Sequence, residues 1–365
     1  MYRIKCVICY GKLEILFQRT NFPITANPPK SSQEYNNDIY SDQVFYKCVN
    51  CSCTQLGTLI DPVILYDSCH NNTFNTPTWK EHHSKFCDFI DIKKYKHILE
   101  IGGTGILYNL LKAKQPDIQY TSLDICDPVE PISDITYYKG NCEDYNFPEN
   151  IPVVLSHVFE HLFNPRKFVE SLSNSNVESI YISIPNMAKL LDTNTSNILH
   201  NEHTFYIDKV IIEWLFSQYN YQLSDYYEFR NHSIFLHFVK KHTYLEQSIE
   251  LIRRPEISEK IYKLFKEDGN RLKNIKIKDN SFIIPAGLYG QFIIYSCNPS
   301  NIRGFLDNDR TKQNQRVYGT PYTVFSFDEI LKYDNLTIYI LAGPYKNELI
   351  QQINSYNKNI EIIEL

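Results

Sequence analysis

The segment ILEIGGTGILYNLLKAKQPDIQYTSLDICD holds the residues best suited to binding a ligand. It predicts a strand that ends near Glu100, a tight turn, a helix, and a second strand that finishes at Asp124. The turn uses Gly102, Gly103 and Gly105, and glycines there let the backbone approach a ligand, while the acid after the second strand can bind ribose hydroxyls. The sequence lacks the third glycine of a dinucleotide fingerprint, and the acid before the turn disfavours a pyrophosphate. The pattern therefore favours an adenosine without phosphates.

Cysteines form a second group with chemical potential. Cys6 pairs with Cys9 and Cys48 with Cys51, each as a C-x-x-C unit. In a reducing cytosol such pairs indicate a metal site rather than disulfides. Two pairs can close a tetrahedral zinc site, and four thiolates leave no position for water, so we expect a structural zinc. The nearby Cys53 is an alternative to Cys51.

Acid–base side chains also follow the strand-like run SIYISIPN, where His200, Glu202 and His203 occur within four residues. Ligands bind past the carboxyl ends of strands in an open parallel sheet. An imidazole titrates near neutral pH, so His203 suits the removal of a proton. Glu202 is expected to orient a substrate or to hold a protonated partner.

Another histidine pair, His157 and His161, encloses Glu160 in SHVFEHL. The spacing resembles that of metal ligands, but in an H-E-x-x-H site the glutamate directly follows the first histidine. We therefore do not expect a metal at this pair.

Composition limits the protein class. The 365 residues are 43% apolar and 22% charged, which predicts two or three folded units rather than disorder. A formal net charge of -5 disfavours nucleic-acid binding as the main activity. No apolar run approaches the roughly 20 residues that a membrane helix needs, and the amino-terminal residues are charged, so we expect a cytoplasmic protein without a membrane partner.

Strand and helix candidates alternate through the middle of the chain, which predicts an α/β fold with a mostly parallel sheet. The run YYEFRNHSIFLHFVKK predicts an antiparallel pair at its edge, with a turn at Asn231 and His232. We expect a small cysteine-rich domain, a central α/β domain, a helical connector and a smaller Rossmann-like α/β domain, at 1–78, 79–243, 244–279 and 280–365.

The segments LEIGGTG, SLDI, KGNCEDYNF and VVLSHVFEHL resemble the class I methyltransferases that use S-adenosylmethionine. The resemblance implies a Rossmann-like central domain and an enzyme. It also implies that Asn141 and Cys142 flank the adenine and that His157 lies at the mouth of the pocket. The remaining cofactor-binding residues are then Glu100, Gly102, Gly103, Gly105 and Asp124.

The order of a four-cysteine region, a methyltransferase domain and a second α/β domain resembles the sugar C-methyltransferases, as do NEHTFY and IPAGLYG. These enzymes methylate a carbon of a nucleotide-linked keto-deoxysugar. The resemblance implies that His203 is the base that forms an enolate and that Glu202 matches a family residue. His200 stands where the family has an enolate-stabilising tyrosine, and Tyr206 matches a tyrosine of the sugar pocket.

Two other functions fit the sequence. In a sugar or glycan O-methyltransferase, His203 would deprotonate a hydroxyl instead of a carbon. In a non-catalytic zinc-containing scaffold, the methyltransferase fold would only bind a partner, which the acidic net charge makes less favourable for nucleic acid. Gly287 and Gly290, with Asp307 after the next strand, predict a turn that cradles the diphosphate of the sugar nucleotide, binds a dinucleotide, or only packs.

Overall fold

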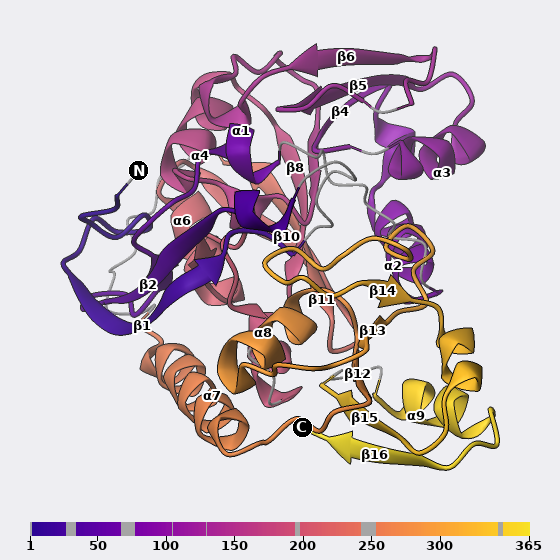
Figure 1. The fold of residues 1–365 in the computed structure, drawn as a ribbon. Helices are drawn as coiled ribbons and strands as arrows, with labels where there is room; N and C mark the ends of the chain where they lie inside the picture. Colours follow the sequence, from indigo (N-terminus) through magenta and orange to yellow (C-terminus); the bar gives the residue numbers. More distant parts are fainter. Residues whose placement is uncertain are drawn as a thin grey trace. The chain divides into compact units, whose positions relative to one another are not determined.

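The computed structural model describes residues 2–26, 34–66, 77–103, 105–128, 130–193, 198–241, 253–341 and 346–365 (Figure 1). They form two compact units. The first unit comprises Met1–Leu16, Phe45–Leu190 and Glu202–Ser258. The second unit comprises Phe17–Val44, Leu191–Asn201 and Glu259–Leu365. No helix among these described residues is long and apolar enough to cross a membrane.

A seven-stranded sheet in the order β10-β11-β8-β7-β4-β5-β6 forms the centre of the first unit. Its strands are β4 (His97–Ile101), β5 (Gln119–Asp124), β6 (Ile135–Lys139), β7 (Val153–Ser156), β8 (Ser179–Pro185), β10 (Tyr221–Phe229) and β11 (Ser233–Lys240). The pairs from β8 through β6 are parallel, whereas β11 is antiparallel to both β8 and β10. Strand order reverses between β4 and β7, and a ligand in such a sheet binds outside the strand ends at this point.

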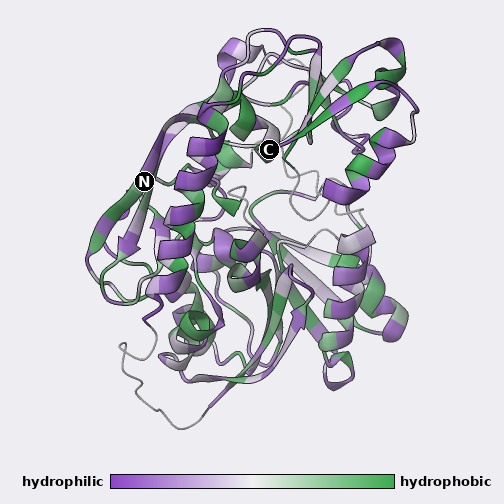
Figure 2. Cartoon of the chain, turned by 90° about the horizontal axis from the view of Figure 1, so that it is seen from below, coloured by the Kyte–Doolittle hydropathy of each residue, from purple (hydrophilic) through white to green (hydrophobic). Residues whose placement is uncertain are grey.

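Helices α2 (Pro77–Phe89), α3 (Ile106–Lys114), α4 (Pro165–Asn174) and α6 (Lys209–Ser217) belong to the first unit, with the single-turn α1 (Pro62–Leu65) and α5 (Met187–Leu190). Helices α4 and α6 begin at side-chain caps, because Asn164 accepts from the Lys167 amide and Asp208 from the Ile211 amide. The helices carry both hydrophilic and hydrophobic segments in Figure 2. Strand β8 is buried along its whole length, as expected for an inner strand covered on both faces.

A smaller sheet has the order β1-β2-β3-β9, with strands β1 (Leu13–Pro23), β2 (Tyr40–Cys48), β3 (Thr54–Leu56) and β9 (Phe205–Tyr206). Strand β3 pairs antiparallel with β9, so that Thr54 lies opposite Tyr206 and Gln55 opposite Phe205. This pairing joins the region after the second cysteine pair to the segment that follows His203.

The second unit contains a parallel sheet in the order β14-β13-β12-β15-β16. Its strands are β12 (Ser281–Ile284), β13 (Gly304–Leu306), β14 (Val324–Phe325), β15 (Leu336–Ile340) and β16 (Ile360–Glu364), and its helices include α8 (Leu288–Cys297) and α9 (Lys346–Asn354). Helix α7 (Pro255–Lys273) begins in the first unit and continues into the second. Short 3-10 helices complete the described chain: η1 (Tyr35–Asn37), η2 (Ile92–Lys94), η3 (Cys142–Asp144), η4 (Phe159–His161), η5 (Leu191–Thr193) and η8 (Phe327–Lys332).

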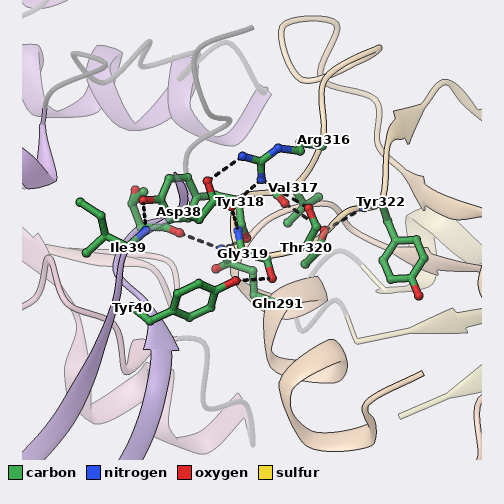
Figure 3. Close-up of polar contacts among 11 residues, drawn as sticks. Asp38, Ile39, Tyr40, Gln291, Arg316, Val317, Tyr318, Gly319, Thr320 and Tyr322 are labelled. Atoms are coloured by element: carbon green, nitrogen blue, oxygen red, sulfur yellow. Dashed lines mark hydrogen bonds and ion pairs between the residues drawn. The ribbon is translucent and has the colours of Figure 1, made fainter. Parts of the chain in front are cut away.

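A buried ion pair ties the amino-terminal part of the second unit to its carboxyl-terminal part (Figure 3). The fully buried carboxylate of Asp38 accepts two hydrogen bonds from Arg316, one of them 2.6 Å long, and a third from the Gly319 amide at 2.7 Å. Paired, hydrogen-bonded burial of this kind satisfies a charge that would otherwise be costly away from water.

The predicted α/β class is confirmed, and so is the antiparallel edge pair with its turn at 230–232. The predicted strands at 97–101 and 179–185 coincide with β4 and β8. Sequence reasoning missed β6 and β16. Residues 242–252 of the expected connector lie outside the described residues, and the division at 78, 243 and 279 stays a prediction.

Candidate functional site

The glycine turn lies directly after β4 and leads into α3. Gly102 and Gly105 have φ values of 71° and 82°, a region that side chains rarely adopt. A Cβ atom at Gly103 would lie 2.1 Å from the Glu100 carboxylate oxygen Oε2. The turn therefore accepts only glycine at these positions without rearrangement.

Glu100 supports this turn from the interior of the sheet. Its side chain is buried, and the Tyr120 hydroxyl on β5 donates to Oε2 at 2.8 Å. Burial raises the pKa of Glu100 to about 7. Glu100, which the sequence predicts to bind the cofactor, thus lies against Gly103 of the turn and is held there by a hydrogen bond from β5.

Asp124 lies at the carboxyl end of β5, beside the glycine turn. The Gly102 amide donates to the Leu123 carbonyl at 3.0 Å, which joins the ends of β4 and β5. The Asp124 carboxylate accepts the Cys126 amide at 2.9 Å, which orients it at this edge. The structure therefore brings together the predicted glycines and the predicted ribose-binding acid.

Asn141 and Cys142 follow β6 but differ in exposure. The exposed Asn141 caps η3 by accepting the Glu143 amide at 2.9 Å. The Cys142 side chain is buried in the hydrophobic core. Their predicted adenine contacts remain a prediction.

His157 lies immediately after β7, with a φ of 54°. Its amide donates to the Ser183 carbonyl at 2.8 Å, and its Nε2 lies 2.8 Å from the Ser233 hydroxyl. Burial lowers the pKa of His157 to about 3, so the ring is neutral at physiological pH. The Trp79 ring packs edge-on against it at 4.9 Å.

A buried carboxyl group, Glu160, lies among three imidazoles. Its Oε1 atom is 3.2 Å from His157 Nδ1 and 4.0 Å from His203 Nε2. One ligand atom each from Glu160, His161 and His203 lie within 4.8 Å of one another. Burial raises the pKa of Glu160 to about 7. Sequence reasoning gave Glu160 no role, although its place between two histidines was a signal.

Tyr66 also belongs to this cluster, and sequence reasoning missed it. Its hydroxyl lies 2.8 Å from His161 Nδ1. Burial raises the pKa of Tyr66 well above its ordinary value, and the charges of Glu202 and Glu160 raise it further. The side chain thus remains a neutral phenol beside two acidic residues.

The predicted catalytic residues divide between the two compact units. Glu202, His203 and Tyr206 belong to the first, whereas His200 belongs to the second. The Asn201 amide donates to the carbonyls of Pro23 and Ile24, which is a structural role. Tyr206 is fully buried, with its ring 6.2 Å from that of His203. His203 itself is 14% exposed and therefore lies at the edge of the cluster.

The four predicted cysteine ligands lie together, with their sulfur atoms within 4.8 Å of one another. The Sγ atoms of Cys6 and Cys51 are 3.6 Å apart and those of Cys9 and Cys48 are 3.4 Å apart. A tetrahedral zinc with Zn–S bonds of about 2.3 Å separates its sulfurs by about 3.8 Å. The donor set therefore fits zinc.

A lysine from the segment after β13 contacts the glycine turn of the second unit. Lys312 Nζ donates to the Ala286 carbonyl at 3.1 Å and to Asp307 at 3.2 Å. Gly287, with φ 123°, begins α8 next to this ammonium group. The turn that could bind a diphosphate thus has one ammonium group beside it, that of Lys312, which already forms an ion pair with Asp307.

No family model matches the sequence, and no curated protein matches it. Solved structures similar to this chain include several that are named as methyltransferases. The structure of TnmH is 11% identical over 49% of this chain and 60% of its own, with a TM-score of 0.40. Magnesium protoporphyrin IX methyltransferase from Synechocystis PCC 6803, with bound SAH, is 12% identical over 50% of this chain and all of its own, with a TM-score of 0.39. Human N-acetylserotonin methyltransferase in complex with SAM is 12% identical over 51% of this chain and 63% of its own, with a TM-score of 0.37.

The buried carboxyl of Glu160 predicts a pH-dependent contribution to stability. Because burial raises its pKa from 4.5 to about 7, its contribution is present below pH 4.5 and is lost as pH rises through 7. This pKa shift corresponds to a loss of roughly 3 kcal/mol at most in the free energy of unfolding. The free energy of unfolding, measured with urea at several pH values between 4.5 and 7, should therefore decrease less with rising pH in Glu160→Gln than in the wild type. The half-exposed Glu213→Gln is the control, and parallel curves for wild type and Glu160→Gln would contradict burial of the acid.

Proposed function

We propose that the protein is a methyltransferase that uses S-adenosylmethionine. The observation that carries this proposal is the placement of the glycine turn and Asp124 at the carboxyl ends of the adjacent strands β4 and β5. They lie next to the point where strand order reverses, where α/β sheets bind nucleosides and nucleotides. Gly102, Gly103 and Gly105 would border the cofactor, and the Asp124 carboxylate would accept hydrogen bonds from its ribose.

The neutral state of the surrounding histidines supports a cationic cofactor. Burial lowers the pKa of His157 and of His232 to about 3, so neither ring carries a charge that would repel a sulfonium. When bound, S-adenosylmethionine supplies an electrophilic methyl group.

Asp124→Ala should weaken S-adenosylmethionine binding roughly 10- to 100-fold, because hydrogen bonds to a charged group contribute about 1.5–3 kcal/mol each. Isothermal titration calorimetry measures this change. Asp127→Ala is the matched control, since Asp127 is an exposed acid close in sequence that forms an ion pair with Lys139. Equal affinities for Asp124→Ala and the control would remove the ribose assignment.

The proposed substrate is a nucleotide-linked keto-deoxysugar, and the proposed reaction is methylation of a carbon beside its ketone. This rests on the family resemblance of the cysteine pairs, the NEHTFY segment and the closing α/β unit, together with the clustering of His203, Glu160 and His161. His203 removes the proton from the carbon, and the electrons of the C–H bond form an enolate. The carbon would then form a bond to the methyl group as the sulfur–methyl bond breaks, which leaves neutral S-adenosylhomocysteine, and His203 would release the proton to solvent.

The surroundings of His203 support its role as base. An imidazolium formed by proton transfer would lie beside the Glu160 carboxyl, whose nearest oxygen is 4.0 Å from Nε2. Ionised Glu160 would stabilise that positive charge. With the proton on His161 Nδ1, that nitrogen would donate to the Tyr66 oxygen, and the Tyr66 hydroxyl would in turn donate to a developing enolate oxygen.

His203→Ala should lower turnover by roughly 100- to 10,000-fold, the usual contribution of a general base, while S-adenosylmethionine affinity is unchanged. His237→Gln is the control, because that histidine, on β11, lies in hydrogen-bond contact with Ser179 at the amino end of β8. Incubation of a keto-sugar nucleotide in deuterated water should exchange the proton beside the ketone in the wild type and not in His203→Ala. Methylation without exchange would favour the O-methyltransferase, and tight binding of neither compound would favour the non-catalytic scaffold.

We also propose that the four-cysteine cluster holds a structural zinc, supported by its sulfur separations. Metal analysis should find about one zinc per chain in the wild type, and Cys51→Ala should lose it because three thiolates leave an incomplete tetrahedral site. Cys53→Ala is the control. The Cys53 thiol points to the Thr54 carbonyl at 3.5 Å, so this variant should keep its zinc. Loss of zinc from Cys53→Ala alone would reassign the fourth ligand.

A further inference from the structure

Arg3 is an arginine buried within the first unit, 9% exposed, on the segment just before the first cysteine pair. Burial lowers its pKa to about 10, so the guanidinium remains charged at physiological pH. Its side-chain nitrogens donate to four backbone carbonyls and to one hydroxyl, all of them uncharged groups. Such an arrangement uses the planar fork of the guanidinium to fix backbone positions.

The fork joins two segments that carry the candidate catalytic residues. Nη2 donates to the carbonyls of Phe163 at 2.7 Å and Leu162 at 3.2 Å, directly after His161. Nη1 donates to the carbonyl of Thr204, and Nη2 to its hydroxyl at 3.0 Å, directly after His203. One side chain thus fixes the backbone next to both histidines.

Thr204 strengthens the same junction. Its amide donates to the Glu160 carbonyl at 2.9 Å, and its hydroxyl donates to the Leu162 carbonyl. Its carbonyl also accepts the Leu56 amide of β3 at 3.0 Å. The spacing between His203 and Glu160 is therefore determined by hydrogen bonds centred on Thr204.

The cysteine cluster is joined to this junction through β3. Strand β3 starts three residues after Cys51 and pairs with β9. The Gln55 side chain accepts the Val7 amide at 3.0 Å and donates to the Lys5 carbonyl at 3.3 Å, which links β3 to the first cysteine pair. Arg3 itself donates its amide to the Gly57 carbonyl at 2.8 Å.

We propose that Arg3 is a positioning residue through which the cysteine cluster sets the place of His203 relative to Glu160 and His161. A filled cluster holds the two cysteine pairs, these hold β3 and the start of the chain, and Arg3 with β3 holds Thr204. The inference rests on the proposed function for its catalytic meaning, but the mechanical link from cluster to Thr204 is independent of any substrate.

The test compares full-length, zinc-loaded Arg3→Met, Arg3→Lys and Arg166→Met with the wild type by hydrogen–deuterium exchange. Arg166 is the matched control, because it also donates to a carbonyl of the amino-terminal segment, that of Ile8, but not to Thr204. In Arg3→Met, amides in peptides that cover 204–206 should exchange at least tenfold faster. Peptides from β4 and β5 should be unchanged. Arg3→Lys should resemble Arg3→Met, because an ammonium cannot bridge both segments.

Zinc removal by a chelator should produce the same local increase in the wild type. S-adenosylmethionine affinity should stay within twofold and zinc content should be unchanged in Arg3→Met. Once a substrate that the wild type methylates is identified, kcat of Arg3→Met should be at least tenfold lower while KM changes little. Unchanged exchange at 204–206 in both Arg3 variants, or after zinc removal, would overturn the proposal. If Arg3→Met exchanges quickly in every peptide, the whole fold is destabilised. Exchange at 204–206 in Arg3→Lys then tests the proposal. Failure to bind S-adenosylmethionine would refute the proposed function and leave the exchange result standing.

Discussion

The parallel pairing of β5, β4 and β7 is the constraint on which the candidate cofactor site depends. Parallel strands end at the same edge, so three turns that are distant in sequence lie next to one another. The glycine turn follows β4, Asp124 ends β5, and His157 follows β7. A Cβ atom at Gly102 would lie 2.6 Å from a Val158 methyl carbon, which shows how closely the β4 and β7 turns approach. The site is thus a property of the sheet rather than of one motif.

Burial of ionisable groups gives this edge its electrostatic character. Glu100 and Glu160 are buried, and burial raises the pKa of each to about 7. The same effect lowers the pKa of His157 and His82, so the rings packed around Trp79 stay neutral. Groups whose pKa lies near 7 gain and lose protons at neutral pH without a large cost in free energy, as a general acid or base must. The same carboxyl groups reduce the stability of the fold when they must ionise away from water, so their ionisation opposes folding.

Sequence reasoning found the features that depend on local pattern. The glycine turn, Asp124 and the cysteine pairs are each encoded within a few residues, and the structure places them as expected. Tyr66 and Glu160 were missed because their roles arise from contacts between distant segments. Strand β6 was missed because only its first residue is buried, so its sequence lacks an apolar run. The joint role given to the residues at 200–203 stays a prediction, since the division between the two compact units falls between Asn201 and Glu202.

Contacts to backbone carbonyls explain how the amino-terminal segment can fix the backbone next to His161 and His203. A carbonyl fixed by a charged donor in a low-dielectric interior is held more firmly than one that bonds to water, because the exchange with solvent is lost. Glu143 acts on the same backbone from the other side, accepting the amides of Phe163 and Asn164. The segment after His161 is therefore held through both its carbonyls and its amides by two opposite charges, which in turn attract each other. Removing either charge leaves the other buried without compensation, so the two side chains and the loop between them form one cooperative element.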